Sequence, residues 1–182
     1  MAYIGKTPTS VPLTSSDIAD GIISTAKIAD DAVIAAKLGV GATNAPIFLV
    51  KSAGNGQALN HATHTKVTDW GTPVIDTASN WDSTNNRYVF DTAGKYLVQA
   101  SLYFVIAAFN KRLQMSVRKN NSPDFLATVS SGKNNSANVA YVNTYAATNY
   151  LEIFGYQDQS SGNITMATEA VMTFLSITKI IE

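Results

Sequence analysis

Alternation of apolar and polar residues recurs through the last three-quarters of the sequence and restricts this part to β-structure. From Lys95, the stretch KYLVQASLYFVIA places every second residue on one apolar face of a long strand. In RLQMSVRKNN, the apolar Leu113, Met115 and Val117 alternate with polar or charged residues before an Asn-rich turn. NVAYVNTYAA, YLEIFGYQ and shorter runs bring the total to about nine or ten strands. We therefore predict that residues 46–182 form an all-β domain, an antiparallel jelly-roll sandwich of about ten strands.

The last apolar run, EAVMTFLSITKII, breaks this alternation because both of its faces are apolar. Ala170, Met172 and Phe174 fall on one face, and Val171, Leu175 and Ile177 fall on the other. A strand that is apolar on both sides is usually covered on both, and in a two-sheet protein the outer cover comes from a loop or another subunit. We expect the face with Val171, Leu175 and Ile177 to lie in a subunit interface.

The first 45 residues have a different composition from the rest of the chain. Ala, Ile, Asp, Ser and Thr dominate, and no aromatic residue follows Tyr3 until Phe48. The Gly-containing segment GVGATNAP marks the boundary between the two parts. The sequence therefore predicts three parts, a peptide of residues 1–15, a repeat segment of residues 16–45 and a head domain of residues 46–182.

Residues 16–45 contain a ten-residue repeat that aligns Ile18 with Ile28 and Leu38. Ten residues match neither the heptad nor the eleven-residue period of coiled coils, which favours short helical turns alternating with extended pieces. One chain of this kind cannot bury its apolar residues, so we expect other copies of the chain to cover them. A disordered, Ala-rich leader is the alternative interpretation. The apolar stripe of the predicted stem consists of Ile18, Ile22, Ile23, Ile28, Val33 and Leu38.

The charge balance argues against nucleic acid as a partner. Thirteen basic residues balance thirteen acidic ones, so the excess of positive charge that binds phosphate backbones is missing. The chain has no cysteine, and therefore neither disulfides nor a thiolate metal site. MAYIGKTPTSVPL lacks the features of a secretory signal, and no segment approaches the ~20 apolar residues that span a bilayer. We expect a protein that is made in the cytoplasm without membrane insertion.

Three short motifs contain residue types that occur in catalytic or metal sites, but none of them supports an enzyme. His61 and His64 in HATH lack a nearby Glu or Cys that would complete a metal site. DTAG at 91–94 fits a structural turn better than an aspartic-protease motif. SSGK at 130–133 lacks the other residues of a phosphate-binding loop. We therefore expect a non-enzymatic protein with no cofactor and no assigned metal site.

The run NWDSTNNRYVFDTAGKYLVQASLYF, residues 80–104, resembles the globular heads of complement, collagen-associated and tumour-necrosis-factor-like proteins. The later runs MSVRKNN, YLEIFGY and TFLSI resemble the following strands of that family in order. The resemblance implies a ten-stranded jelly roll assembled as a tight trimer, although the collagen stalk of some members is absent. The matching residues are Asn80, Trp81, Asp82, Tyr88, Phe90, Gly94, Tyr96 and Phe104.

The N-terminal part resembles bacteriophage fibre proteins, in the opening AYIGKTP and in the repeat TAKIADDAV. This resemblance implies that a short peptide around Tyr3 and Ile4 anchors the chain to other virion proteins. It also implies that residues 16–45 wind around a threefold axis, so that the protein is a homotrimer in the virion.

A host-surface ligand is expected at the loops of the head that lie farthest from the stem. Asn, Gln, Ser and Asp side chains suit hydroxyl-rich partners such as surface polysaccharide, and Tyr141 or Tyr156 could offer a stacking face. The favoured function is an adhesive fibre, and the rival is a capsid or tail decoration protein without a receptor. A free-standing carbohydrate-binding module is a third interpretation. The candidate contact residues are Asn120, Asn121, Lys133, Asn134, Asn135, Tyr156, Asp158, Gln159 and Asn163.

Overall fold

The computed structural model describes residues 46–106, 111–129, 136–159 and 162–181. The predicted anchor peptide, including Tyr3 and Ile4, and the predicted stem of residues 16–45 lie outside the described residues. The same holds for the candidate contacts Lys133, Asn134 and Asn135. The fold described below is therefore that of the predicted head domain.

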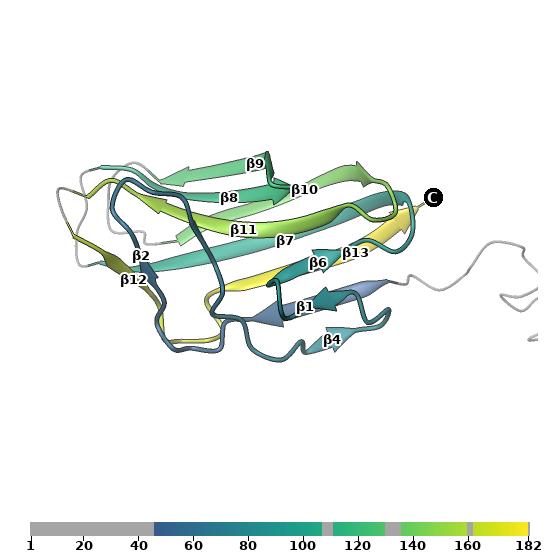
Figure 1. Cartoon of the computed structure of the whole chain (residues 1–182), viewed down its shortest axis with the longest axis horizontal. Helices are drawn as coiled ribbons and strands as arrows, with labels where there is room; N and C mark the ends of the chain where they lie inside the picture. The colour runs from purple at the N-terminus through teal and green to yellow at the C-terminus, as the bar shows by residue number, and fades with distance from the viewer. Residues whose placement is uncertain (1–45, 107–110, 130–135, 160–161, 182) are drawn as a thin grey trace, which may run out of the picture. The chain divides into compact units, whose positions relative to one another are not determined.

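Thirteen strands in the described residues form two sheets, and all of these strands pair antiparallel (Figure 1). The first sheet has the order β4 (Ile75–Asp76), β1 (Ile47–Lys51), β13 (Phe174–Ile181), β7 (Gly94–Val105) and β10 (Ser136–Tyr145). β12 (Ile164–Met166) pairs with the end of β7, and β2 (Ala58–Leu59) pairs with β12. The second sheet has the order β5 (Trp81–Asp82), β6 (Arg87–Val89), β11 (Tyr150–Gln157), β8 (Leu113–Lys119) and β9 (Ser122–Val129), with β3 (Thr65–Lys66) paired to β11.

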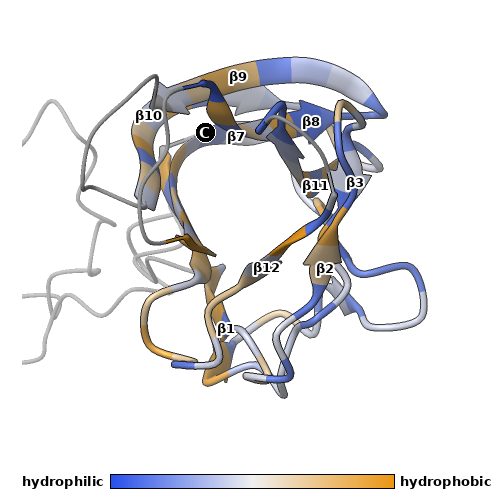
Figure 2. Ribbon diagram, turned by 90° about the vertical axis from the view of Figure 1, so that its left-hand side faces the viewer, coloured by the Kyte–Doolittle hydropathy of each residue, from blue (hydrophilic) through white to orange (hydrophobic). Residues whose placement is uncertain are grey.

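The two sheets curve around one apolar core, as the view along the strands shows (Figure 2). The predicted core residues of β8 are confirmed, because Leu113, Met115 and Val117 are at most 1% exposed, although Gln114 and Ser116 on the other face are also buried. One end of the core is aromatic, and the rings of Phe90 and Tyr145 stack there with their centroids 4.1 Å apart. The predicted all-β jelly-roll sandwich is therefore confirmed for the head domain.

The prediction that Leu175 and Ile177 lie in a subunit interface is wrong, because in β13 both face the core, and the outward face of the strand carries Ser176 and Thr178. Leu175 and Ile177 are 1% and 0% exposed, and they belong to the core. Phe174, at the start of the strand, lies on the opposite, outward face. Val171 is 68% exposed and precedes β13 rather than forming part of it. The pairing of β13 between β1 and β7 decides which face points inward, and that pairing is not visible in one strand's sequence.

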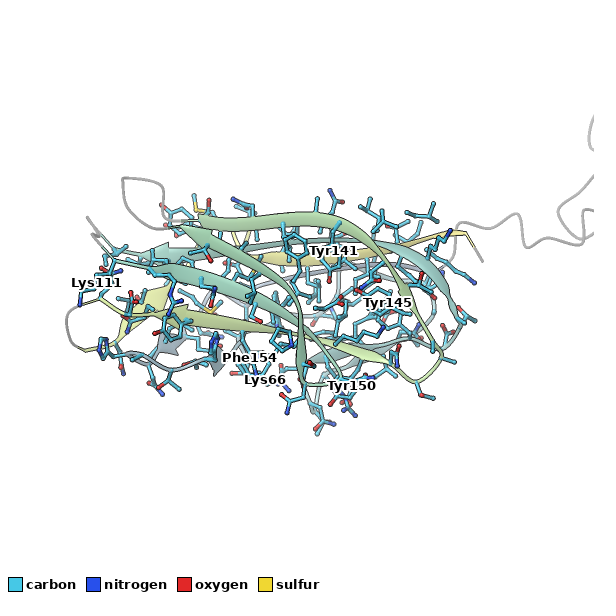
Figure 3. The ribbon with its side chains drawn as sticks, turned by 90° about the horizontal axis from the view of Figure 1, so that it is seen from above. Lys66, Lys111, Tyr141, Tyr145, Tyr150 and Phe154 are labelled. Carbon is cyan, nitrogen blue, oxygen red and sulfur yellow. The ribbon has the colours of Figure 1, made fainter. Side chains whose placement is uncertain are left out.

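At the edge where β9 meets β10, the two sheets are linked by a carboxylate and two tyrosines. Asp124 of β9 accepts hydrogen bonds from the hydroxyls of Tyr141 and Tyr145 and from the Asn143 amide. Tyr141 and Tyr145 lie together on the same strand (Figure 3). Burial, followed by the hydrogen bond to Asp124, raises the pKa of Tyr145 well above its ordinary value. Tyr141, one of the two predicted stacking residues, already stacks on Phe125 with ring centroids 4.8 Å apart.

Candidate functional site

The predicted contact residues divide between the two ends of the sandwich. β1 begins and β13 ends at one end, here called the terminal end; the opposite end is called the distal end (Figure 1). β11 runs toward the distal end, since it pairs antiparallel with β8, which runs toward the terminal end. Tyr156, Asp158, Gln159 and Asn163 therefore lie together at the distal end.

Asn120 and Asn121 lie at the terminal end, which contradicts their predicted place beside the distal loops. They form the two-residue turn between β8 and β9, and both have positive φ, of 49° and 64°. A two-residue turn joins the end of β8 directly to the start of β9. It therefore lies at the opposite end of this hairpin from the connections that lead into β8 and out of β9. The backbone N–H of Asn120 donates to the carbonyl of Tyr150 at the start of β11, which fixes this turn at the terminal end.

An aromatic and charged cluster covers the distal part of the second sheet. The ring of Tyr156 contacts the imidazole of His64, with centroids 4.8 Å apart, and the guanidinium of Arg112, 4.5 Å from the ring centroid. Arg112 and Asp158 are linked by the backbone N–H of Arg112, which donates to the Asp158 carboxylate at 2.6 Å. Partial burial, and then repulsion by Arg118 and Arg112, lowers the pKa of His64 below 6.5. Tyr156 is thus already engaged by both of these side chains.

The two histidines do not form a metal site together. His64 stacks on Tyr156, whereas the backbone of His61 bridges that of Gln157. Within the part of the chain that the structure describes, no group of three or more His, Cys, Asp or Glu side chains could hold an ion. In the same part, no helix is both long and apolar enough to cross a bilayer.

The outward face of the first sheet is uncharged over two complete rows of paired residues, which we call the association face. One row runs across four strands through Ile47, Thr178, Leu97 and Val142. The next row runs through Leu49, Ser176, Gln99 and Ala140. Val142 is 56% exposed, and the neighbouring apolar residues are half-buried. Exposed apolar residues gathered on one face of a sheet make that face a candidate surface for contact with another protein.

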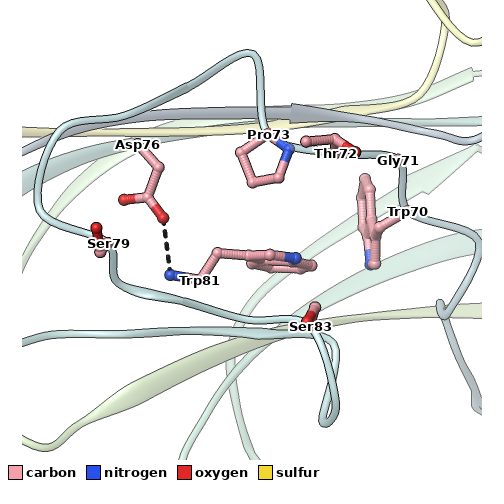
Figure 4. Close-up of a pocket in the computed structure, with 8 residues that line it drawn as sticks. All are labelled: Trp70, Gly71, Thr72, Pro73, Asp76, Ser79, Trp81 and Ser83. Carbon is pink, nitrogen blue, oxygen red and sulfur yellow. Dashed lines mark hydrogen bonds between the residues drawn. The ribbon is translucent and has the colours of Figure 1, made fainter.

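A pocket that the sequence analysis missed lies beside β4 and β5 (Figure 4). It has a volume of about 610 Å³, and both tryptophans of the chain, Trp70 and Trp81, line it. The sequence did contain one hint of this pocket. The only two tryptophans of the chain lie eleven residues apart, with a Gly-Thr-Pro segment between them. Alternation could not find this site, because Trp70 lies outside every strand except for an isolated bridge to Ser52.

The structure of the head domain is similar to those of tumour-necrosis-factor-like proteins. The Eiger tumour necrosis factor of S. frugiperda superposes with a TM-score of 0.60 at 15% identity, covering 75% of this chain and 92% of that one. Murine APRIL superposes with a TM-score of 0.57 at 17% identity, covering 74% of this chain and 98% of that one. No protein-family model and no curated protein sequence matches the chain. The head domain of this protein therefore has the jelly-roll fold of tumour-necrosis-factor-like domains.

Proposed function

We propose that this chain is a non-enzymatic homotrimer, a fibre protein of a phage-type virion that attaches the particle to the host surface. In this proposal residues 1–15 anchor the chain to other virion proteins, and residues 16–45 form a threefold stem. The jelly-roll head then presents binding surfaces to polysaccharide of the host. The repeat in residues 16–45 and the resemblance of AYIGKTP to fibre openings support the virion part of the proposal.

The association face is the observation that carries the trimer. Leu97 and Val142 are paired neighbours on β7 and β10, and their side chains project from the same outward face. Leaving such a surface in water is unfavourable, because each Å² of apolar surface that is buried contributes about 25 cal/mol. The same fold occurs in the tumour-necrosis-factor-like structures described above. Other copies of the chain are the simplest cover for a face that every copy carries.

The oligomeric state of the full chain tests this proposal first. Sedimentation equilibrium at micromolar concentration should give three times the mass of 19.4 kDa. A folded monomer would refute the proposal.

Thiol protection then tests whether the association face is the surface that becomes buried. The chain has no cysteine, so a single introduced cysteine reports one position. Val142→Cys in the assembled protein should react with a thiol reagent at least about tenfold more slowly than Thr84→Cys, because burial shields the thiolate. Thr84 is exposed on the β5–β6 turn of the second sheet and is the matched control. Equal reaction rates for the two variants would contradict the assignment of this face.

Attachment is tested with the same full-length protein on host cells and on virus particles that lack it. Binding to cells supports the adhesive role. Binding to particles without binding to cells would support the rival role, a decoration protein of the capsid or tail.

A further inference from the structure

We propose that the pocket of Trp70 and Trp81 binds a neutral saccharide, an inference that rests on the proposed attachment function and names its ligand class. None of the predicted contact residues lines this pocket. The site would therefore place carbohydrate at the side of the sandwich, in addition to or instead of the distal loops.

The two indole rings form a rigid corner. Their centroids are 6.2 Å apart and their planes meet at 84° (Figure 4). The ring of Trp81 is backed by the fully buried Phe48, with centroids 5.4 Å apart and planes 24° apart. The indole N–H of Trp70 donates to the carbonyl of Val67 at 3.1 Å, which fixes the second ring. Because both rings are held before any ligand arrives, binding would not need to order them.

Polar groups on the opposite wall complement this corner. The two carboxylate oxygens of Asp76 accept the backbone N–H groups of Asn80 and Trp81, each at 3.0 Å, which holds the carboxylate in place. A carboxylate oxygen can accept more than one hydrogen bond, so Asp76 retains capacity for a ligand hydroxyl. The hydroxyls of Ser79 and Ser83 also line the pocket.

This combination fits a sugar better than the other common ligand classes. A pyranose ring has an apolar face of C–H groups, which packs on an aromatic ring, and a rim of hydroxyls, which needs acceptors and donors. Asp76 is the only charged residue among those that line the pocket, so an anionic ligand such as a phosphate or an acidic sugar would be repelled. The volume of about 610 Å³ lies within the range of about 300–1,000 Å³ that is usual for small-molecule sites.

The pocket and the association face lie on opposite sides of β4. Asp76 pairs with Phe48, whose side chain is in the core, so Asp76 lies on the side of the strand that faces the second sheet. Ile75 pairs with Leu49, which belongs to the association face. Self-association through that face therefore does not use the Asp76 side chain.

The experiment uses the two indole N–H signals of the ¹⁵N-labelled full chain. Neutral trisaccharides of glucose, galactose, mannose and N-acetylglucosamine are titrated, with inorganic phosphate as the anionic comparison. We expect at least one trisaccharide to shift both indole signals with saturation, at a dissociation constant on the order of 1 mM, and phosphate to shift neither.

Two neighbouring variants locate the binding. Ser83 lines the pocket and is exposed, so Ser83→Arg fills the pocket from a position that tolerates a long side chain. It should weaken binding at least about tenfold, whereas Thr84→Arg adds the same charge one residue away and should change affinity less than about twofold. Unchanged indole signals with every trisaccharide, or a shift that survives Ser83→Arg, would overturn the inference.

The outcomes also separate this inference from the proposed function. A trimer that binds host cells, loses that binding on Tyr156→Ala and shows no indole shift would refute the pocket and leave the attachment function standing. A monomer that does not bind cells, yet shows the indole shift, would refute the fibre proposal and leave the sugar site standing.

Discussion

Replacing Asp124 by alanine is predicted to destabilise the head domain strongly, although Asp124 lies at the edge of the sandwich. Its carboxylate accepts from the Tyr141 hydroxyl and the Asn143 amide at 2.8 Å each, and from the Tyr145 hydroxyl at 2.5 Å. Tyr145 is fully buried and stacks on Phe90 in the core. The substitution therefore removes an acceptor from a buried hydroxyl that has no access to water.

The size of the destabilisation depends on whether the three donors find another hydrogen-bond partner once the Asp124 carboxylate is removed. A hydrogen bond to a charged group contributes about 1.5–3 kcal/mol, so three independent bonds would give more than about 4 kcal/mol. The hydroxyls of Tyr141 and Tyr145 are 3.1 Å apart and can still bond to one another, and the half-buried Asn143 can turn toward water. We therefore expect Asp124→Ala to lower the free energy of unfolding by about 2–4 kcal/mol.

Urea unfolding at a fixed protein concentration measures this change, and a double-mutant cycle with Tyr145→Phe isolates the pair. Tyr145→Phe should cost clearly less in the Asp124→Ala background than in the natural sequence. The exposed Glu169 is the control carboxylate, and Glu169→Ala should change stability by no more than about 0.5 kcal/mol. A loss below about 1 kcal/mol for Asp124→Ala, or additive effects in the cycle, would refute this reasoning.

Two further predictions concern close packing and a histidine. Gly155→Ala should cost about 1–3 kcal/mol in urea unfolding, because a Cβ at this position would lie 2.9 Å from Leu59 and 3.1 Å from Leu102. Tyr156→Ala should raise the pKa of His64 toward 6.5 in an NMR titration, since the packed tyrosine ring contributes to its burial. Because the lowered pKa makes the folded state bind fewer protons than the unfolded state, stability falls as the pH drops through 6.5, and this fall should be smaller in Tyr156→Ala. An unchanged His64 titration in the variant would show that the tyrosine ring does not affect the pKa.

The sequence by itself determined the class of the head domain and most of its core. Period-two alternation identified the core residues of β8, Leu113, Met115 and Val117, because successive side chains in a strand point to opposite faces, but it did not predict the burial of Gln114 and Ser116 on the other face. The motifs from Asn80 to Phe104 also indicated the tumour-necrosis-factor-like jelly roll. Proteins that share a fold place similar turn and core residues in the same order along the chain.

The tertiary structure alone decided which apolar face points inward and which residues meet across the chain. The sequence run from Ala170 to Ile177 offered two apolar faces, and only the pairing of β13 with β1 and β7 placed Leu175 and Ile177 in the core and left Phe174 facing outward. Trp70 and Trp81 form one corner only because their segments approach at the edge of the two sheets. The physical reason is that alternation encodes relations between neighbours in one strand, whereas the direction of burial and the pocket depend on contacts between distant segments.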